Sequence, residues 1–225
     1  MRITLPYIVV ALLTSISFQA NAAIAITEVA PWASGNAPYG NDWFELTNTG
    51  SSSINISGWK VDDSSNSFAS ALNLNGISSI NAGQSVIFIE STGGEDISSF
   101  INTWFGSGPA PLVGYYSGSG IGLSTSGDAL NIYNSTGVRQ ANVTFGASDS
   151  TSPYQTFDNA TGLNGSISNL SVVGTNGAFI AANDRFEIGS PGTIAAVPEP
   201  ESYALFIAGL SLMGFATRKR IHNKK

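Results

Sequence analysis

Short stretches that alternate apolar and polar residues, separated by glycine, proline, asparagine and serine, run through most of this chain. After Asp42, Phe44 and Leu46 share one face of an extended segment, and we expect both side chains in the core. Glu45 and Thr47 share the opposite face with Trp43. Because helical periodicity is nearly absent, the pattern predicts an all-β fold, a β-sandwich.

Other segments of the chain predict further strands, a turn and one short helix. Residues 86–89 form a continuous apolar run, which is typical of a strand buried on both faces. Residues 134–137 read Asn-Ser-Thr-Gly between two alternating stretches and predict a hairpin turn. A short helix is expected over residues 96–104. The remaining strand candidates are residues 25–29, 54–56, 59–61, 72–74, 130–132 and 138–145.

The first 22 residues have the three parts of a secretory signal peptide. Arg2 supplies the positive start, residues 5–18 the apolar middle, and Ala20-Asn21-Ala22 the small-residue cleavage site. We therefore expect signal peptidase to cut after Ala22.

The C-terminal end is a short apolar segment between prolines and positive charges. Residues 203–216 would rise roughly 21 Å as a helix, less than the ~30 Å hydrocarbon core, so a single transmembrane helix here needs its flanks. Arg218, Lys219 and Arg220 can reach the headgroups and fix this end in the cytoplasm. Pro198 and Pro200 prevent the helix from extending backwards.

This tail resembles the PEP-CTERM sorting signal of Gram-negative bacteria, with Pro198-Glu199-Pro200 as the motif. The resemblance implies that an exosortase reads and processes the tail. The protein would then start as a single-pass precursor in the inner membrane and end at the cell surface or in the extracellular matrix. The alternative is an ordinary C-terminal anchor that is never cut.

The two signals divide the chain into a signal peptide (1–22), a β-domain (23–196) and a sorting signal (197–225, with the basic end 217–225). Between the signals, Lys60, Arg139 and Arg185 stand against thirteen acidic residues, which gives a formal net charge of −10. Such a surface repels phosphate backbones and anionic lipid, so no nucleic-acid partner is expected. It tolerates Ca²⁺ or a polysaccharide.

The lack of cysteine and of histidine in the β-domain narrows its chemistry. The chain has no cysteine and one histidine, His222, in the tail. Disulfides, thiolate nucleophiles, Ser-His pairs and imidazole metal ligands are therefore excluded from the β-domain. Among common catalytic devices only pairs of carboxylates remain.

Several motifs of the β-domain, taken in order, resemble the lamin tail domain, an immunoglobulin-like β-sandwich. The resemblance spans about residues 24–193, departs at Asn142, where bacterial members often have an acid, and leaves residues 151–183 without a clear register. It implies a binding or scaffolding module and brings no catalytic residues. The motifs are Ile26-Thr27-Glu28-Val29, residues 42–48, residues 54–59, Ala82-Gly83, Gly122-Leu123-Ser124, Gly127-Asp128 and Gly189-Ser190-Pro191-Gly192.

Polar candidates in the β-domain have structural interpretations. Glu45 and Asp128 could be mistaken for a catalytic pair, but we expect both to accept hydrogen bonds from backbone at strand ends and loops. We expect Trp59 in the core. Asp62-Asp63 and Glu90 with Glu95-Asp96 offer oxygen ligands for weak Ca²⁺ binding, although a solvated acidic surface is the simpler interpretation. No metal or other cofactor is assigned.

Aromatic residues outside the alternating pattern are candidates for stacking on sugars, with loop packing as the simpler expectation. They are Trp32, Tyr39, Trp104, Tyr115 and Tyr116.

The sequence thus predicts an exported, non-enzymatic surface or matrix protein whose β-sandwich is a structural, adhesive or binding module. Exopolysaccharide or another matrix protein is the expected partner. The alternatives are a secreted metal-dependent hydrolase that uses only Asp and Glu side chains, and a permanently membrane-anchored surface protein.

Overall fold

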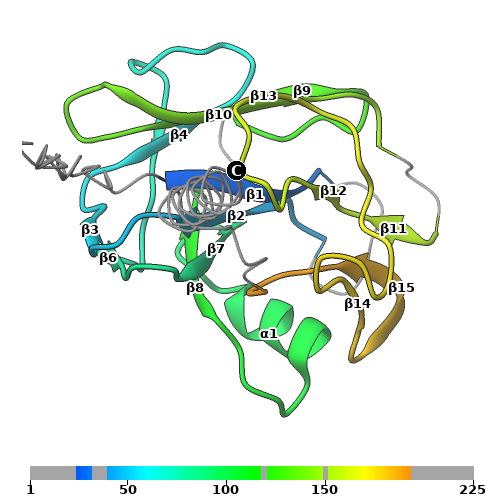
Figure 1. Cartoon of the computed structure of the whole chain (residues 1–225). Helices are drawn as coiled ribbons and strands as arrows, with labels where there is room; N and C mark the ends of the chain where they lie inside the picture. The colour runs from blue at the N-terminus through cyan, green and yellow to red at the C-terminus, as the bar shows by residue number, and fades with distance from the viewer. Residues whose placement is uncertain (1–23, 32–39, 118–120, 149–151, 194–225) are drawn as a thin grey trace, which may run out of the picture. The chain divides into compact units, whose positions relative to one another are not determined.

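Two five-stranded sheets carry the fold (Figure 1). The computed structural model describes residues 24–31, 40–117, 121–148 and 152–193. The first sheet has the order β12 (Phe157–Asp158), β1 (Ile24–Ala30), β2 (Trp43–Asn48), β7 (Ser85–Glu90) and β8 (Leu112–Tyr116). The second has the order β13 (Gly165–Ile167), β10 (Arg139–Phe145), β9 (Asp128–Tyr133), β4 (Lys60–Asp62) and β5 (Leu72–Asn73).

Smaller elements complete the described chain. A two-stranded sheet pairs β3 (Ile54–Asn55) with β6 (Ser79–Ile80). A three-stranded sheet has the order β11 (Tyr154–Gln155), β15 (Asp184–Gly189) and β14 (Phe179–Ala181). The helix α1 spans Ile97–Phe105.

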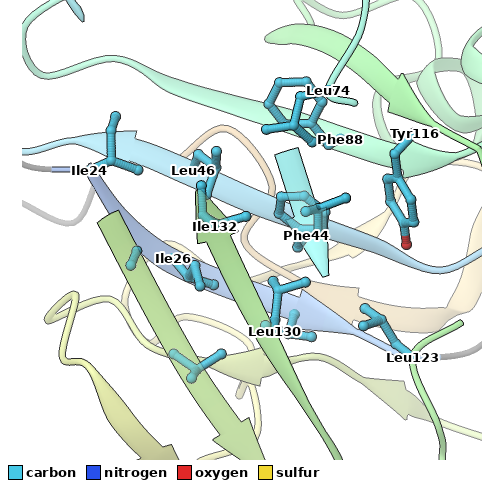
Figure 2. Packing of buried hydrophobic residues seen from close by; sticks show 14 of the residues in the cluster. Ile24, Ile26, Phe44, Leu46, Leu74, Phe88, Tyr116, Leu123, Leu130 and Ile132 are labelled. Atoms are coloured by element: carbon cyan, nitrogen blue, oxygen red, sulfur yellow. The ribbon is translucent and has the colours of Figure 1, made fainter. Parts of the chain in front are cut away.

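The main core lies between the two large sheets (Figure 2). Ile26, Phe44 and Phe88 of the first sheet belong to the same buried cluster as Leu130 and Ile132 of the second. The Phe44 and Phe88 rings stack with centroids 5.7 Å apart. Apolar side chains at alternate positions of facing strands remove the most apolar surface from water, which stabilises a sandwich. The predicted immunoglobulin-like sandwich is confirmed, with Phe44 in its core.

The outer face of the first sheet is also covered. Trp43, Ile87 and Ile89 point away from the main core and form a second buried cluster with Phe100 and Trp104 of α1. The Trp43 ring meets the rings of Phe100 and Trp104 edge-on, at 5.5 Å and 5.6 Å. The predicted burial of residues 86–89 on both faces is therefore confirmed.

The predicted helix and hairpin are both present. The helix α1 begins at Ile97, one residue after its predicted start, and ends before Gly106, whose φ is 58°. In the hairpin that joins β9 and β10, the Asn134 side chain accepts hydrogen bonds from the backbone N–H groups of Thr136 (3.0 Å) and Val138 (2.9 Å). A side chain that caps the turn in this way fixes the register of the two strands.

Two short strands within residues 152–183 form one edge of each large sheet. The strand β12 adds to β1, with Glu28 opposite Asp158, and β13 adds in parallel to β10, with Val143 opposite Gly165. These strands have only two and three residues, too short for an alternating pattern to reveal them in the sequence.

Candidate functional site

Two acidic side chains lie next to each other in the interior of the first sheet. Glu28 of β1 is directly opposite Glu45 of β2 in the antiparallel register. The register shifts between Ile26 and Glu28, so Thr27 is an extra residue and shares the side of Glu28 and Glu45. The exposed fractions of Glu28 and Glu45 are only 0% and 1%.

Backbone N–H groups of one turn bind both carboxyl groups. This turn, Gly189–Gly192, begins with the last residue of β15. The Ser190 N–H donates to Glu28 Oε1 at 2.7 Å, and the Gly192 N–H donates to Glu45 Oε2 at 2.6 Å. Hydroxyl groups supply the other bonds, from Thr156 to Glu28 Oε1 and from Thr27 to Glu45 Oε1. The two carboxyl groups therefore fasten the end of the last strand to the middle of the sheet.

The interior position changes the protonation of this pair. Burial, together with the nearby charge of Glu45, raises the pKa of Glu28 to about 8. Burial raises the pKa of Glu45 to about 7, although the hydrogen bonds from Thr27 and Gly192 oppose this rise. Glu28 Oε2 is buried and has no hydrogen-bond partner among the described residues, so a proton there avoids an unsolvated charge.

A polar hollow of about 140 Å³ opens beside β12 and β13. Asp158 is its one charged side chain, and its carboxyl oxygens accept hydrogen bonds from the Ala160 N–H (2.8 Å) and from Asn176 Nδ2 (2.7 Å). Its volume is below the several hundred Å³ typical of pockets for drug-sized ligands. The hollow therefore suits one small polar group. Its lining is Asp158, Asn159, Ala160, Thr161, Leu163, Ser166, Ile167, Ser168, Asn169 and Asn176.

Some side chains that line this hollow are already hydrogen-bonded within the protein, and others are exposed to solvent. Asn159 is buried, and its side chain bonds to the backbone carbonyls of Ile26 and Leu163 at 2.6 Å and 2.9 Å. Thr161, Ser166, Ser168 and Asn169 are exposed. Hydroxyl and amide groups of this kind both donate and accept hydrogen bonds, which matches the hydroxyl groups of a sugar.

A further polar group lies where β2 begins and β7 and β8 end. Asp42 is buried there and accepts a hydrogen bond from the Leu123 N–H at 2.7 Å. Burial, and then the charges of Asp42 and Glu90, raise the pKa of Tyr116. The Tyr116 hydroxyl is buried without a hydrogen-bond partner among the described residues. This arrangement contributes no accessible site, because Asp42 and Tyr116 are both fully buried.

Glu45 and Asp128 do not form a pair in the structure. Glu45 lies in the first sheet, and Asp128 starts β9 in the second. Asp128 accepts hydrogen bonds from the backbone N–H groups of Ser64 (3.2 Å) and Ser124 (3.0 Å). Both acids therefore bind backbone N–H groups, as predicted.

Two of the five aromatic candidates for sugar stacking are buried. Trp104 is 1% exposed and Tyr116 is 0% exposed, so neither can meet a ligand, and both pack in the clusters of the core. Tyr115 is partly buried against the second cluster. Trp32 and Tyr39 lie outside the described residues. Trp59 belongs to the main core, as predicted.

The acidic residues suggested for calcium are spread out. Among the described residues, no three or more Asp, Glu, His or Cys side chains gather closely enough to hold a metal ion. Asp62 is buried rather than solvated, and its Oδ2 accepts hydrogen bonds from Ser65 Oγ (2.8 Å) and the Ser67 N–H (2.6 Å). Asp96 Oδ2 accepts from Asn41 Nδ2 at 2.8 Å. These two acids organise loops.

The predicted sorting residues lie outside the described part of the chain. They are Ala20, Ala22, Pro198, Glu199, Pro200, Arg218, Lys219 and Arg220. The predicted span, residues 203–216, lies outside it as well. Within the described residues, no helix has the length and apolar character needed to cross a membrane.

Sequence reasoning missed the partnership of Glu28 with Glu45. Strict alternation places Glu28 on the same face as Ile26, but the bulge at Thr27 moves it to the opposite face. The one sequence signal for this partnership was that Glu28, Glu45 and residues 189–192 all belong to the motifs that resemble the lamin tail domain. The polar hollow was missed because its residues come from two short strands and the loops that flank them.

Comparison with known families matches two parts of the chain. No curated protein matches it significantly. The PEP-CTERM protein-sorting motif matches residues 196–220, which marks an exported protein and implies processing by an exosortase. The Lamin Tail Domain matches residues 17–147, which include β1 to β10 but not β11 to β15, so the match lacks one edge strand of each large sheet, β12 and β13. Because this match covers more than half of the sequence, the chain belongs to the lamin tail domain family.

Proposed function

We propose that this exported protein is a non-enzymatic component of the cell surface or extracellular matrix, and that its sandwich is an adhesive or structural module that binds polysaccharide. The observation that carries the proposal is the order of the two matches: the lamin tail domain match (residues 17–147) is followed by the sorting-motif match (residues 196–220). A module delivered in this way works outside the cytoplasm, where polysaccharide is the abundant hydrated partner.

The acidic side chains named above hydrogen-bond within the fold, which supports a binding role rather than a catalytic one. Glu28 and Glu45 are closed off from solvent and bonded to a backbone turn, so a substrate cannot reach them. Asp62 and Asp128 bind backbone N–H groups of loops. A glycosidase needs two carboxyl groups that flank an open cleft, and these acids are engaged in holding the fold.

The polar hollow is the candidate place for contact with a sugar. The available groups of Thr161, Ser166, Ser168 and Asn169 can bond to hydroxyl groups, and the hollow accommodates part of one sugar ring. Asp158 is the only charged group in the lining, and the β-domain carries a formal net charge of −10. A neutral polysaccharide therefore suits this surface better than an acidic one.

The experiment is a pull-down of the secreted protein with exopolysaccharide from the native host, together with neutral and acidic reference polysaccharides. Binding to the native and neutral polymers, and weaker binding to the acidic one, is expected. Ser168→Ala combined with Asn169→Ala should reduce binding by about tenfold, since each lost hydrogen bond contributes about 0.5–1.5 kcal/mol. The matched control is Ser51→Ala combined with Asn81→Ala. Both residues are exposed, neither lines the hollow, and their side chains make no hydrogen bond among the described residues.

A purified protein that stays entirely in solution with every polymer would contradict the proposal. Calcium titration followed by a screen on polysaccharide and nucleic-acid substrates tests the hydrolase alternative. Turnover that is lost in Glu45→Gln or Asp128→Asn, while the protein stays folded, would replace binding by enzymatic activity.

A further inference from the structure

The Gly189–Gly192 turn is attached to the sandwich at two points, and both are carboxyl groups. Glu28 holds the Ser190 N–H and Glu45 holds the Gly192 N–H. The backbone approaches closely: a Cβ atom at Gly189 would lie 2.6 Å from Glu28 Oε1 and 2.9 Å from the Trp104 ring. The position of the turn therefore depends directly on these two acids.

Among the described residues, no Lys or Arg side chain hydrogen-bonds to either carboxyl group, and their donors are hydroxyl and backbone N–H groups. The other titratable groups on the strands that pack around the pair are Glu90 on β7, Asp158 on β12, Tyr154 on β11, and Asp184, Arg185 and the buried Glu187 on β15. Arg185 is exposed and lies over the Phe186 ring. Four of these six neighbours are acids and one is a tyrosine, so apart from Arg185 they add no positive charge.

We propose that Glu28 and Glu45 form a proton-controlled latch, which holds the Gly189–Gly192 turn closed while the pair keeps a proton and releases the turn when both acids are ionised.

The direction follows from linkage between protonation and opening. In the closed state the two groups have pKa values of about 8 and about 7, whereas carboxyl groups exposed to water by opening return toward the ordinary value of 4.5. The closed state therefore binds protons more tightly than the open state. Raising the pH through 7 to 8 removes those protons and shifts the equilibrium toward the open turn.

The location of the turn gives this opening a consequence. The described chain ends at Thr193, whose N–H donates to the Ser190 carbonyl oxygen at 2.9 Å, and the sorting-motif match begins at residue 196. Release of the turn frees residues 189–193 and lengthens the chain between the sandwich and the sorting motif. The latch thus controls whether residues 189–193 belong to the folded sandwich.

Hydrogen exchange of the full-length chain, measured by mass spectrometry from about pH 6 to about pH 9, tests the latch. After correction for intrinsic exchange, the protection of the peptide that contains Ser190 and Gly192 should fall by up to about a thousandfold, since loss of the Glu28 proton accounts for about a hundredfold over this range and loss of the Glu45 proton for about tenfold. The hairpin of β9 and β10 is the internal reference and should keep its protection.

Two variants separate the latch from general alkaline loosening. Glu28→Gln imitates the protonated acid, so its turn should stay protected at about pH 9. Glu95→Gln, at an exposed acid that lies on none of the strands around the pair, should keep the pH dependence of the unchanged protein. Constant protection of the turn across the pH range, or a loss shared equally with the hairpin, would overturn the proposal. If Glu28→Gln does not fold, the titration of the unchanged protein still decides between these outcomes.

Discussion

Glu28 and Glu45 face each other across β1 and β2, and both carboxyl groups are buried under a turn that comes more than 140 residues later in the chain. The family match ends at residue 147, before this turn. The central strands of the family are therefore completed, in this chain, by its C-terminal segment.

The first prediction concerns pH and stability. Folding raises the pKa of Glu28 to about 8 and that of Glu45 to about 7, so their contribution to stability is fully present below about pH 4.5 and is lost as the pH rises through 7 and 8. The free energy of unfolding from urea titrations should fall between about pH 5 and pH 8. The double variant Glu28→Gln, Glu45→Gln should show a flatter profile. An unchanged slope would show that other groups cause the dependence.

The close packing of Gly189 gives a second prediction. Because an added methyl group would lie 2.6 Å from Glu28 Oε1 and 2.9 Å from the Trp104 ring, Gly189→Ala should lower the free energy of unfolding by about 1–3 kcal/mol. Gly146→Ala is the matched control, since nothing lies within 4 Å of its added Cβ. Denaturant titration of both variants gives the comparison, and equal stabilities would contradict the described position of the turn.

A third prediction tests whether the second buried cluster belongs to the folded unit. Trp104 is 1% exposed and meets Trp43 and Phe179 edge-on, at 5.6 Å and 5.8 Å. Trp104→Ala should destabilise the protein by about 3–5 kcal/mol. Leu112→Ala, at a side chain that is 52% exposed, should change stability by less than about 0.5 kcal/mol. A small loss for Trp104→Ala would mean that α1 packs independently of the sandwich.

Tyr116 allows a fourth prediction with the opposite sign. Its hydroxyl is buried without a partner among the described residues, while its ring packs against Phe44 at 5.5 Å. Tyr116→Phe removes an unpaired polar group and keeps the ring, so stability should be unchanged or rise by up to about 1 kcal/mol. Thermal unfolding of the variant checks this, and a clear loss of stability would reveal a hydrogen bond to this hydroxyl.

The fifth prediction concerns processing. The mass of the protein recovered from the outside of its host should correspond to a chain that begins at Ala23 and has lost the segment after the Pro198-Glu199-Pro200 motif. Intact-mass spectrometry reports both ends together. A mature protein that keeps residues 203–225 would favour the permanently anchored alternative, and a signal peptide that remains attached would contradict cleavage after Ala22.

The sequence alone determined the features that depend on local pattern. Alternation placed Phe44 in the core, a continuous apolar run identified β7 as buried on both faces, and the Asn134–Gly137 turn identified a hairpin. These features are local because side-chain direction in a strand repeats every two residues and a turn needs only four. The sorting motif was readable for the same reason, since its prolines, apolar segment and charges are contiguous.

Only the tertiary structure decided what Glu28 and Glu45 do. A single bulge reverses the face of Glu28, and distant donors to the two acids come from Thr156, between β11 and β12, and from the Gly189–Gly192 turn. The polar hollow likewise depends on two short strands that join different sheets. Protonation and binding depend on contacts between residues that are far apart in the sequence, and a periodic pattern of apolar residues does not report such contacts.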